Sequence, residues 1–134
     1  MERENPNMNN FVSGLLKAAQ EENWGKIDEK LVPQLKNFDG NQIAKELLGH
    51  ARDENPNIRD VVATALSPLK ISDEQIKYQA VETMMEMATK DKEKFPAGRA
   101  AVFLLGYKQD RNFKEKVEEA LNSFKEKAEK RWHR

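Results

Sequence analysis

Two pairs of oppositely charged residues stand out because their spacing is the same. Asp53 precedes Arg59 by six positions, and Glu93 precedes Arg99 by the same interval. Two such arginines could form a row that binds carboxylate or phosphate groups, because a guanidinium can make two parallel hydrogen bonds to these anions. In the alternative interpretation, each carboxylate caps a helical hairpin while each arginine bonds to turn carbonyls and to the adjacent unit.

The other residue types that often carry catalysis form no constellation. His50 and His133 lie far apart in the sequence, whereas a metal site needs three or four converging donors; a site built from His50 and Asp53 is the alternative that stays open. The serines lack a nucleophile-elbow glycine pattern, the glycines form no phosphate-cradling loop, and cysteine is absent. We therefore expect no catalytic residue, no metal, no cofactor and no enzymatic activity.

Three further groups of residues could contact a partner, and each also has a structural interpretation. Methionines adapt to varied partners, but Met84 and Met87 fall on an apolar helical face and suit a core. Tyr78 and Tyr107 lie at the edges of such faces. They could contact a partner, or they could pack where two helices of the protein meet. The basic residues 130–134 could touch nucleic acid or an acidic partner, or could simply complement a helix dipole.

The length fits a single domain, and the composition is polar with equal numbers of acidic and basic side chains. The chain has 134 residues, 23 basic and 23 acidic side chains, and a mean hydropathy of -0.87. No apolar run approaches the ~18 residues of a membrane span. The N-terminal residues lack the layout of a signal peptide, so we expect a cytoplasmic protein without a membrane partner. The neutral balance gives no general attraction to nucleic acid.

Apolar residues recur at helical spacing almost from end to end, and no stretch alternates as a strand would. The sequence therefore predicts an all-α fold of about seven helices. The run Ala100–Leu105 is apolar at every position, which predicts a helix buried on most sides. The predicted helical segments are 8–19, 24–38, 43–51, 58–69, 76–88, 100–105 and 113–128.

Prolines and polar residues mark the expected breaks. Pro6, Pro56 and Pro96 each precede an apolar segment, where the first helical turn does not need their missing N–H. Pro33 falls inside the second segment and predicts a kink or a restart there. Ser72–Gln75 fits a loose capping box at the start of the fifth segment.

The sequence also repeats itself. Residues 4–8 read Glu-Asn-Pro-Asn-Met, and residues 54–58 read Glu-Asn-Pro-Asn-Ile. A second match lies 40 residues further along, where Pro56 aligns with Pro96. Periods of 20–50 residues are typical of arrays in which each helical hairpin packs against the next.

Residues 53–59, Asp-Glu-Asn-Pro-Asn-Ile-Arg, with the apolar stretch that follows them, resemble the core of a HEAT repeat, a unit of the armadillo-type helical repeats. In that family an acidic residue in the turn precedes, by six positions, an arginine early in the second helix. Asp53 and Arg59 keep this spacing, and so do Glu93 and Arg99. The resemblance implies that these four residues are structural.

The resemblance implies a right-handed α-solenoid of stacked antiparallel helix pairs that fills residues 1–134 as one domain. The clearest repeats are about 40–70 and 72–109, and 112–134 would form a C-terminal capping helix. Such proteins are commonly scaffolds, so we expect a small non-enzymatic module that binds an unidentified protein or peptide, with its binding residues unassigned.

Two other activities occur among HEAT-like proteins. Some bind nucleic acid and excise damaged bases, but the interleaved lysines and glutamates here argue against a basic binding stripe. Others are bilin lyases, and no residue in this sequence indicates that role. Because a small solenoid leaves apolar ends, homodimerisation through a terminal helix is also open.

Overall fold

The computed structural model describes residues 6–132, and within this range it contains seven α-helices and no strand. The all-α prediction and the predicted number of helices are therefore confirmed. None of the helices in this range is both long and apolar enough to cross a membrane. The helices are α1 (Pro6–Gln20), α2 (Trp24–Lys26), α3 (Gly40–Leu48), α4 (Pro56–Leu66), α5 (Glu74–Lys90), α6 (Lys94–Leu105) and α7 (Lys114–Arg131).

The short helix α2 continues into two helical segments of different winding. A π-helical turn, η1 (Ile27–Leu31), leads into a 3₁₀ segment, η2 (Val32–Asn37). Pro33 lies at the start of η2, where its missing N–H breaks the regular ladder, so the helix restarts where the sequence predicts. The side-chain amide of Gln34 donates to the Lys30 carbonyl at 2.7 Å and satisfies a backbone acceptor at the junction.

Short polar side chains cap the helix starts. The Asp39 carboxylate accepts hydrogen bonds from two backbone N–H groups at the start of α3. The predicted capping box at Ser72 is wrong by one residue, because Asp73 is the N-cap of α5 and accepts from the Ile76 N–H at 3.0 Å. A carboxylate interacts more favourably than a hydroxyl with the positive end of a helix. Ser72 instead accepts a hydrogen bond from the Asn41 side chain.

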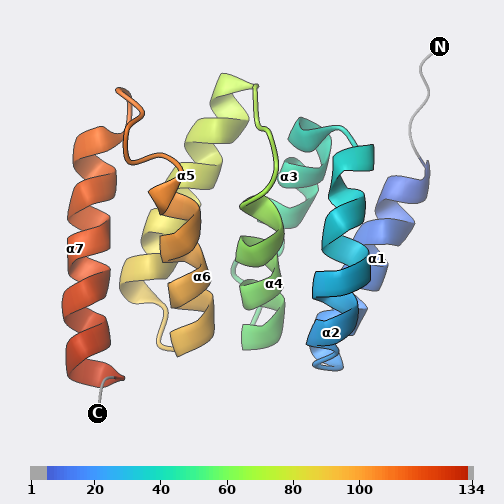
Figure 1. Cartoon of the computed structure of the whole chain (residues 1–134), viewed down its shortest axis with the longest axis horizontal. Helices are drawn as coiled ribbons and strands as arrows, with labels where there is room; N and C mark the ends of the chain where they lie inside the picture. Colours follow the sequence, from blue (N-terminus) through green and yellow to red (C-terminus); the bar gives the residue numbers. More distant parts are fainter. Residues whose placement is uncertain (1–5, 133–134) are drawn as a thin grey trace.

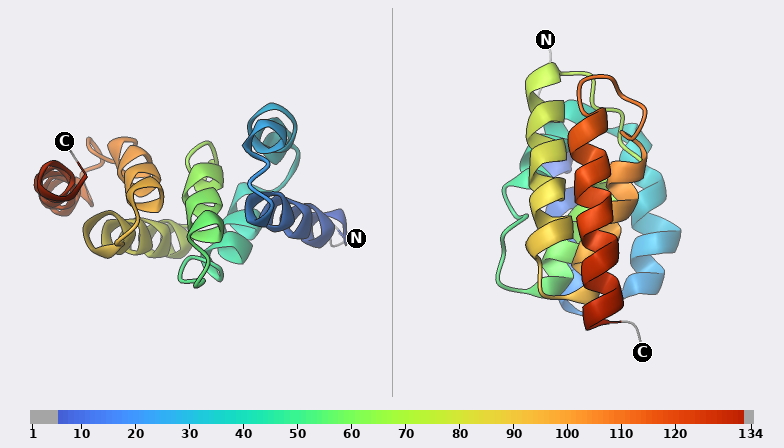
Figure 2. Two further views of the ribbon diagram at one scale, coloured as in Figure 1. Left: turned by 90° about the horizontal axis from the view of Figure 1, so that it is seen from below. Right: turned by 90° about the vertical axis from the view of Figure 1, so that its left-hand side faces the viewer.

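The helices form two layers and run alternately in opposite directions (Figure 1). Helices α1, α3 and α5 make one layer, while the α2–η2 segment, α4 and α6 make the other (Figure 2, left). Helix α7 packs against α5 and α6 and closes the end of the row. Helices α4 and α6 lie side by side in the second layer.

Helix α4 is the centre of the hydrophobic core. Seven of its 11 residues are buried, whereas the only buried residues of the α2–η2 segment are Ile27 and Leu35. Met84 and Met87 of α5 are buried in the same core, as their structural interpretation predicts. The core is therefore densest around α4 and sparse in the α2–η2 segment.

Helix α6 departs from its sequence-based prediction. The run Ala100–Leu105 was expected to be buried on most sides, but Val102 and Leu105 are 56% and 55% exposed. Phe95, at the start of the same helix, is 62% exposed. The prediction is wrong because a two-layer arrangement covers only the side of α6 that faces its neighbours. The outer side of the second layer stays open to solvent along α6 (Figure 2, left).

Candidate functional site

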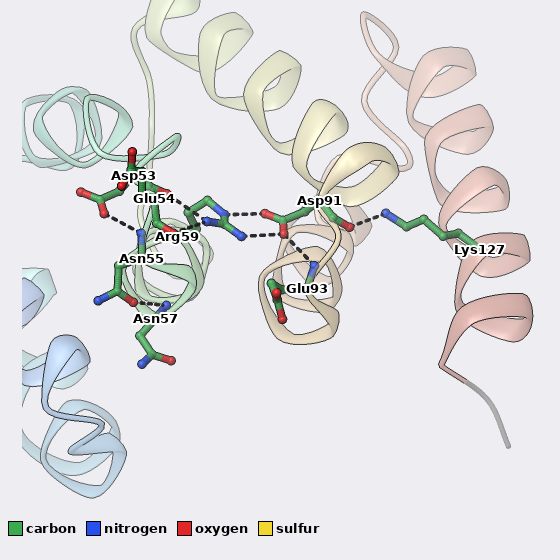
Figure 3. Close-up of polar contacts among 8 residues, drawn as sticks. All are labelled: Asp53, Glu54, Asn55, Asn57, Arg59, Asp91, Glu93 and Lys127. Carbon is green, nitrogen blue, oxygen red and sulfur yellow. Dashed lines mark hydrogen bonds and ion pairs between the residues drawn. The ribbon is translucent and has the colours of Figure 1, made fainter.

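Arg59 joins helix α4 to the turn between α5 and α6 (Figure 3). Its Nε and Nη2 donate to the two carboxylate oxygens of Asp91 at 2.7 and 2.9 Å. Its Nη1 donates to the backbone carbonyls of Asp53 and Glu54 at 2.9 and 3.1 Å. The side chains of Arg59 and Asp91 are 17% and 5% exposed. The hydrogen bonds to Asp91 raise the pKa of Arg59, so the guanidinium stays charged.

Asp91 also connects this turn to helix α7. Its carboxylate accepts a hydrogen bond from the Glu93 backbone N–H at 2.9 Å. Its backbone carbonyl accepts one from Lys127 Nζ, also at 2.9 Å (Figure 3). Burial lowers the pKa of Lys127, although Asp91 opposes this shift. One residue thus links α4, the α5–α6 turn and α7.

Asp91, rather than Glu93, has the structural role of Asp53. The Asp53 carboxylate accepts from the backbone N–H two residues later, at Asn55, the N-cap of α4. This turn geometry is the one that aspartate side chains favour. The same hydrogen bond recurs before α6, from Glu93 to Asp91, and before α7, from Asn112 to Asp110.

Arg99 makes a different contact from Arg59. Its Nε donates to the Asp60 carboxylate on α4 at 3.1 Å, and Thr64 donates to the same carboxylate at 3.2 Å. The Asp60 side chain is 6% exposed and that of Arg99 is 49% exposed. Burial raises the pKa of Asp60, the charge of Arg99 opposes that shift, and Asp28 adds to it. Arg99 therefore covers a buried carboxylate and does not brace its own turn.

The two arginines consequently differ in what they could bind. The guanidinium of Arg59 donates four hydrogen bonds within the protein, which fits a structural role. The two Nη groups of Arg99 donate no hydrogen bond to any residue between 6 and 132. Arg99 is therefore the arginine that can receive a carboxylate or phosphate from outside.

A groove of about 390 Å³ lies beside Arg99, between α6 and α7. Its volume is within the range of ligand pockets, ~300–1,000 Å³. Gly98 leaves a depression on the α6 side, because nothing lies within 4 Å of the place a Cβ would take. Its apolar lining is Phe95, Gly98, Phe124, Ala128 and Trp132, and its charged lining is Lys94, Arg99, Lys125 and Glu129.

Aromatic contacts order the C-terminal end of this groove. The Trp132 and Phe124 rings have centroids 6.2 Å apart, and Lys127 Nζ lies 5.3 Å from the centre of the Trp132 ring. Such contacts hold an indole in place without covering it. Of the C-terminal basic group, His133 and residue 134 lie outside the described residues, whereas Trp132 is part of the groove.

The remaining candidate residues lie apart from this groove. The Tyr107 ring packs against Phe103, with centroids 5.0 Å apart, and burial raises the pKa of its hydroxyl. Tyr78 is half exposed on α5, near Phe113. His50 lines a separate surface hollow between α1 and α3, and no group of three or more metal-binding side chains occurs among residues 6–132.

Neither Asp91 nor the groove between α6 and α7 was identified from the sequence. Asp91 could have been found from the Asp-x-Asn pattern of Asp53–Asn55 and Asp110–Asn112, since Asp91 begins a related turn. The pairing of Asp91 with Arg59 could not have been found, because the two residues lie 32 positions apart in the sequence. The groove also has no sequence signal, because its apolar residues are of the same types as those in the core.

No protein-family profile matches this chain, and neither a curated protein nor a solved structure matches it.

Proposed function

We propose that the protein is a HEAT-like right-handed α-solenoid that acts as a non-enzymatic protein–protein interaction module. The observation that carries this proposal is the apolar outer face of α6. Phe95, Val102 and Leu105 lie on one side of this helix and are each more than half exposed. Exposed apolar side chains that gather on one side of a helix are a feature of sites where another protein binds.

The helical-repeat part of the proposal is supported by how α4 and α6 are built. Each helix follows a turn in which an aspartate accepts the N–H two residues later, and the two helices pack side by side. Each runs antiparallel to the helix before it (Figure 1). This is the arrangement expected of two successive repeats.

The energetic argument concerns how much apolar surface a partner would remove from water. Covering a large aliphatic or aromatic side chain completely contributes about 1.5–3 kcal/mol. Three half-exposed side chains therefore offer roughly 3 kcal/mol, before the walls of the α6–α7 groove are added. Interfaces concentrate their binding energy in a few such residues.

The test is selection of peptides from a random library of amphipathic helices that covers all charge compositions. We expect binders, and we expect the backbone amide shifts that they cause to fall on α6 and α7. Replacing Val102 and Leu105 together by glutamine should weaken binding at least about tenfold, because it removes the apolar contacts. Since both side chains are exposed, the melting temperature should hardly change.

Tyr78→Gln is the matched control, because it removes a similarly exposed apolar side chain from α5. It should leave binding unchanged. A library that yields no binder would contradict the interaction role, and so would binders that are insensitive to the α6 substitutions. Binding of duplex DNA with steep salt dependence would instead support the nucleic-acid alternative.

A further inference from the structure

Building on the interaction role proposed above, we infer that the groove between α6 and α7 binds an amphipathic helix of a partner protein that carries acidic residues beside its apolar face. This goes beyond an interaction role because it specifies the shape and the charge of the occupant.

The shape of the surface fits a helix of about three turns. The exposed apolar side of α6 begins at Phe95 in the groove and continues beyond it to Val102 and Leu105. From Phe95 to Leu105 it spans ten residue steps, or about 15 Å at 1.5 Å per residue. A partner helix places side chains at matching intervals, in positions i, i+3 or i+4, and i+7. The depression at Gly98 can receive one of them, because no atom occupies the space beside it.

The charges around the groove favour an acidic partner. Its lining contains the three cations Lys94, Arg99 and Lys125 but only one carboxylate, Glu129. Helix α6 itself contains no acidic residue. Neither Lys94 nor Lys125 forms an ion pair with any residue between 6 and 132. Acidic side chains that flank an apolar helix face would thus meet an excess of positive charge.

Arg99 is the cation best placed to recognise a carboxylate. Its Nε donates to Asp60, which is itself buried and accepts a hydrogen bond from Thr64. The position of the guanidinium is therefore fixed at its Nε end. Its Nη groups donate to no residue between 6 and 132, and they provide the forked geometry that carboxylates accept. We expect the partner to place a glutamate or aspartate next to the residue that fills the depression at Gly98.

The experiment uses the full chain with Trp24→Phe, so that Trp132 in the groove becomes the only tryptophan. Three helical peptides share one apolar face of leucines and differ only in flanking glutamate, glutamine or lysine. We expect the glutamate peptide to shift Trp132 emission and to bind at least about tenfold more tightly than the lysine peptide. Added salt should reduce this difference.

Arg99→Gln should reduce the preference for glutamate by about five- to tenfold, because the amide carries no charge. Arg52→Gln is the matched control, since Arg52 is exposed, pairs with Glu86 and does not line the groove. If Arg99→Gln lowers the melting temperature because Asp60 loses its cation, the double variant Lys94→Gln and Lys125→Gln tests the preference for glutamate instead. It removes positive charge from the groove and leaves the pair of Arg99 and Asp60 intact.

The outcomes separate this inference from the proposed function. Equal binding of all three peptides, or a preference for lysine, overturns the acidic partner, while loss of binding in the Val102 and Leu105 variant still supports an interaction face. Failure of every peptide, and of the random library, contradicts both. A concentration-dependent dimer in light scattering that is abolished by Val102→Gln and Leu105→Gln would show that a second copy covers the exposed face of α6 beside the groove, and would overturn the inference.

Discussion

At the scale of single residues, Asp91 accepts three hydrogen bonds from the side chains of two other helices. It accepts hydrogen bonds from Arg59 of α4 and Lys127 of α7 while shaping its own turn. Its side chain is almost fully buried, so its charge is stabilised mainly by Arg59. Loss of that arginine would leave a buried carboxylate without its counter-ion.

Arg59→Ala should therefore lower the free energy of unfolding by about 3 kcal/mol. For a chain of this length the melting temperature would fall by roughly 10 °C. Differential scanning calorimetry measures this directly. Arg52→Ala, which removes an exposed ion pair with Glu86, should cost less than about 1 kcal/mol. Unchanged melting of Arg59→Ala together with lost ligand binding would mean that Arg59 is a binding residue.

Asp60 should make stability depend on pH in an unusual direction. Because burial raises its pKa, the folded chain holds the Asp60 proton more tightly than the unfolded chain does. The protonated carboxyl thus favours folding, and this contribution is lost as the pH rises from about 4 through the raised pKa of the folded chain.

The comparison with Asp60→Asn isolates this effect, since asparagine cannot ionise. The unfolding free energy of the wild type minus that of the variant should fall with pH over this interval and then level off. Urea denaturation at a series of pH values measures it. A difference that rises with pH would show that the attraction of Arg99 outweighs the cost of burial.

At this scale the sequence predicts local contacts well and distant contacts poorly. The spacing of Asp53 and Arg59 predicts the arginine's bonds to its own turn, which span five and six residues. The Asp60 carboxylate receives Arg99 from 39 residues away, and no local pattern indicates that pairing. Such contacts depend on which helices become neighbours.

Among the helices, α3 depends on an unusually close contact with the connection between α4 and α5. A Cβ on Gly40 would lie 2.2 Å from the carbonyl oxygen of Lys70. The Asn41 side chain, next in sequence, bonds to Ser72 and accepts from the Asp73 backbone N–H, each at 3.0 Å. The start of α3 is therefore fixed against this connection.

Gly40→Ala should lower the unfolding free energy by about 2 kcal/mol, because backbone on one side must move to admit the methyl group. Gly14→Ala in α1 is the control, since nothing lies within 4 Å of its added Cβ. That change should raise stability by up to about 1 kcal/mol, since alanine favours helix over glycine. Urea denaturation distinguishes the two; equal effects would show that α3 can shift freely.

The seven helices follow from the spacing of apolar residues, and Pro33 marks the change of winding in the second segment. The exposed side of α6 does not follow from the sequence. Val102 and Leu105 are as apolar as Phe103 and Leu104, yet only the latter two are buried. Which side of a helix is covered depends on the layer that packs against it, and that information lies in other segments.

In the molecule as a whole, the unequal core predicts unequal local stability. Most residues of α4 are buried between other helices, whereas the α2–η2 segment has two buried residues and irregular winding. Regions with few buried contacts open more readily than the core. Hydrogen exchange followed by NMR should find the slowest amides in α4 and the fastest helical amides in α2–η2. Uniform protection would show that the chain opens only as one unit.

The bonding of Asp91 has a practical consequence for anyone who wishes to lengthen this protein. An extra residue inserted at 91–93 would move Asp91 away from its partners. Helix α4 would then lose the bond from Arg59 to the Asp91 carboxylate, and α7 would lose the bond from Lys127 to the Asp91 carbonyl. The connection 106–113 carries no comparable bond at Lys108 and Gln109, which both face solvent. An epitope tag or a fluorescent label therefore belongs between these two residues.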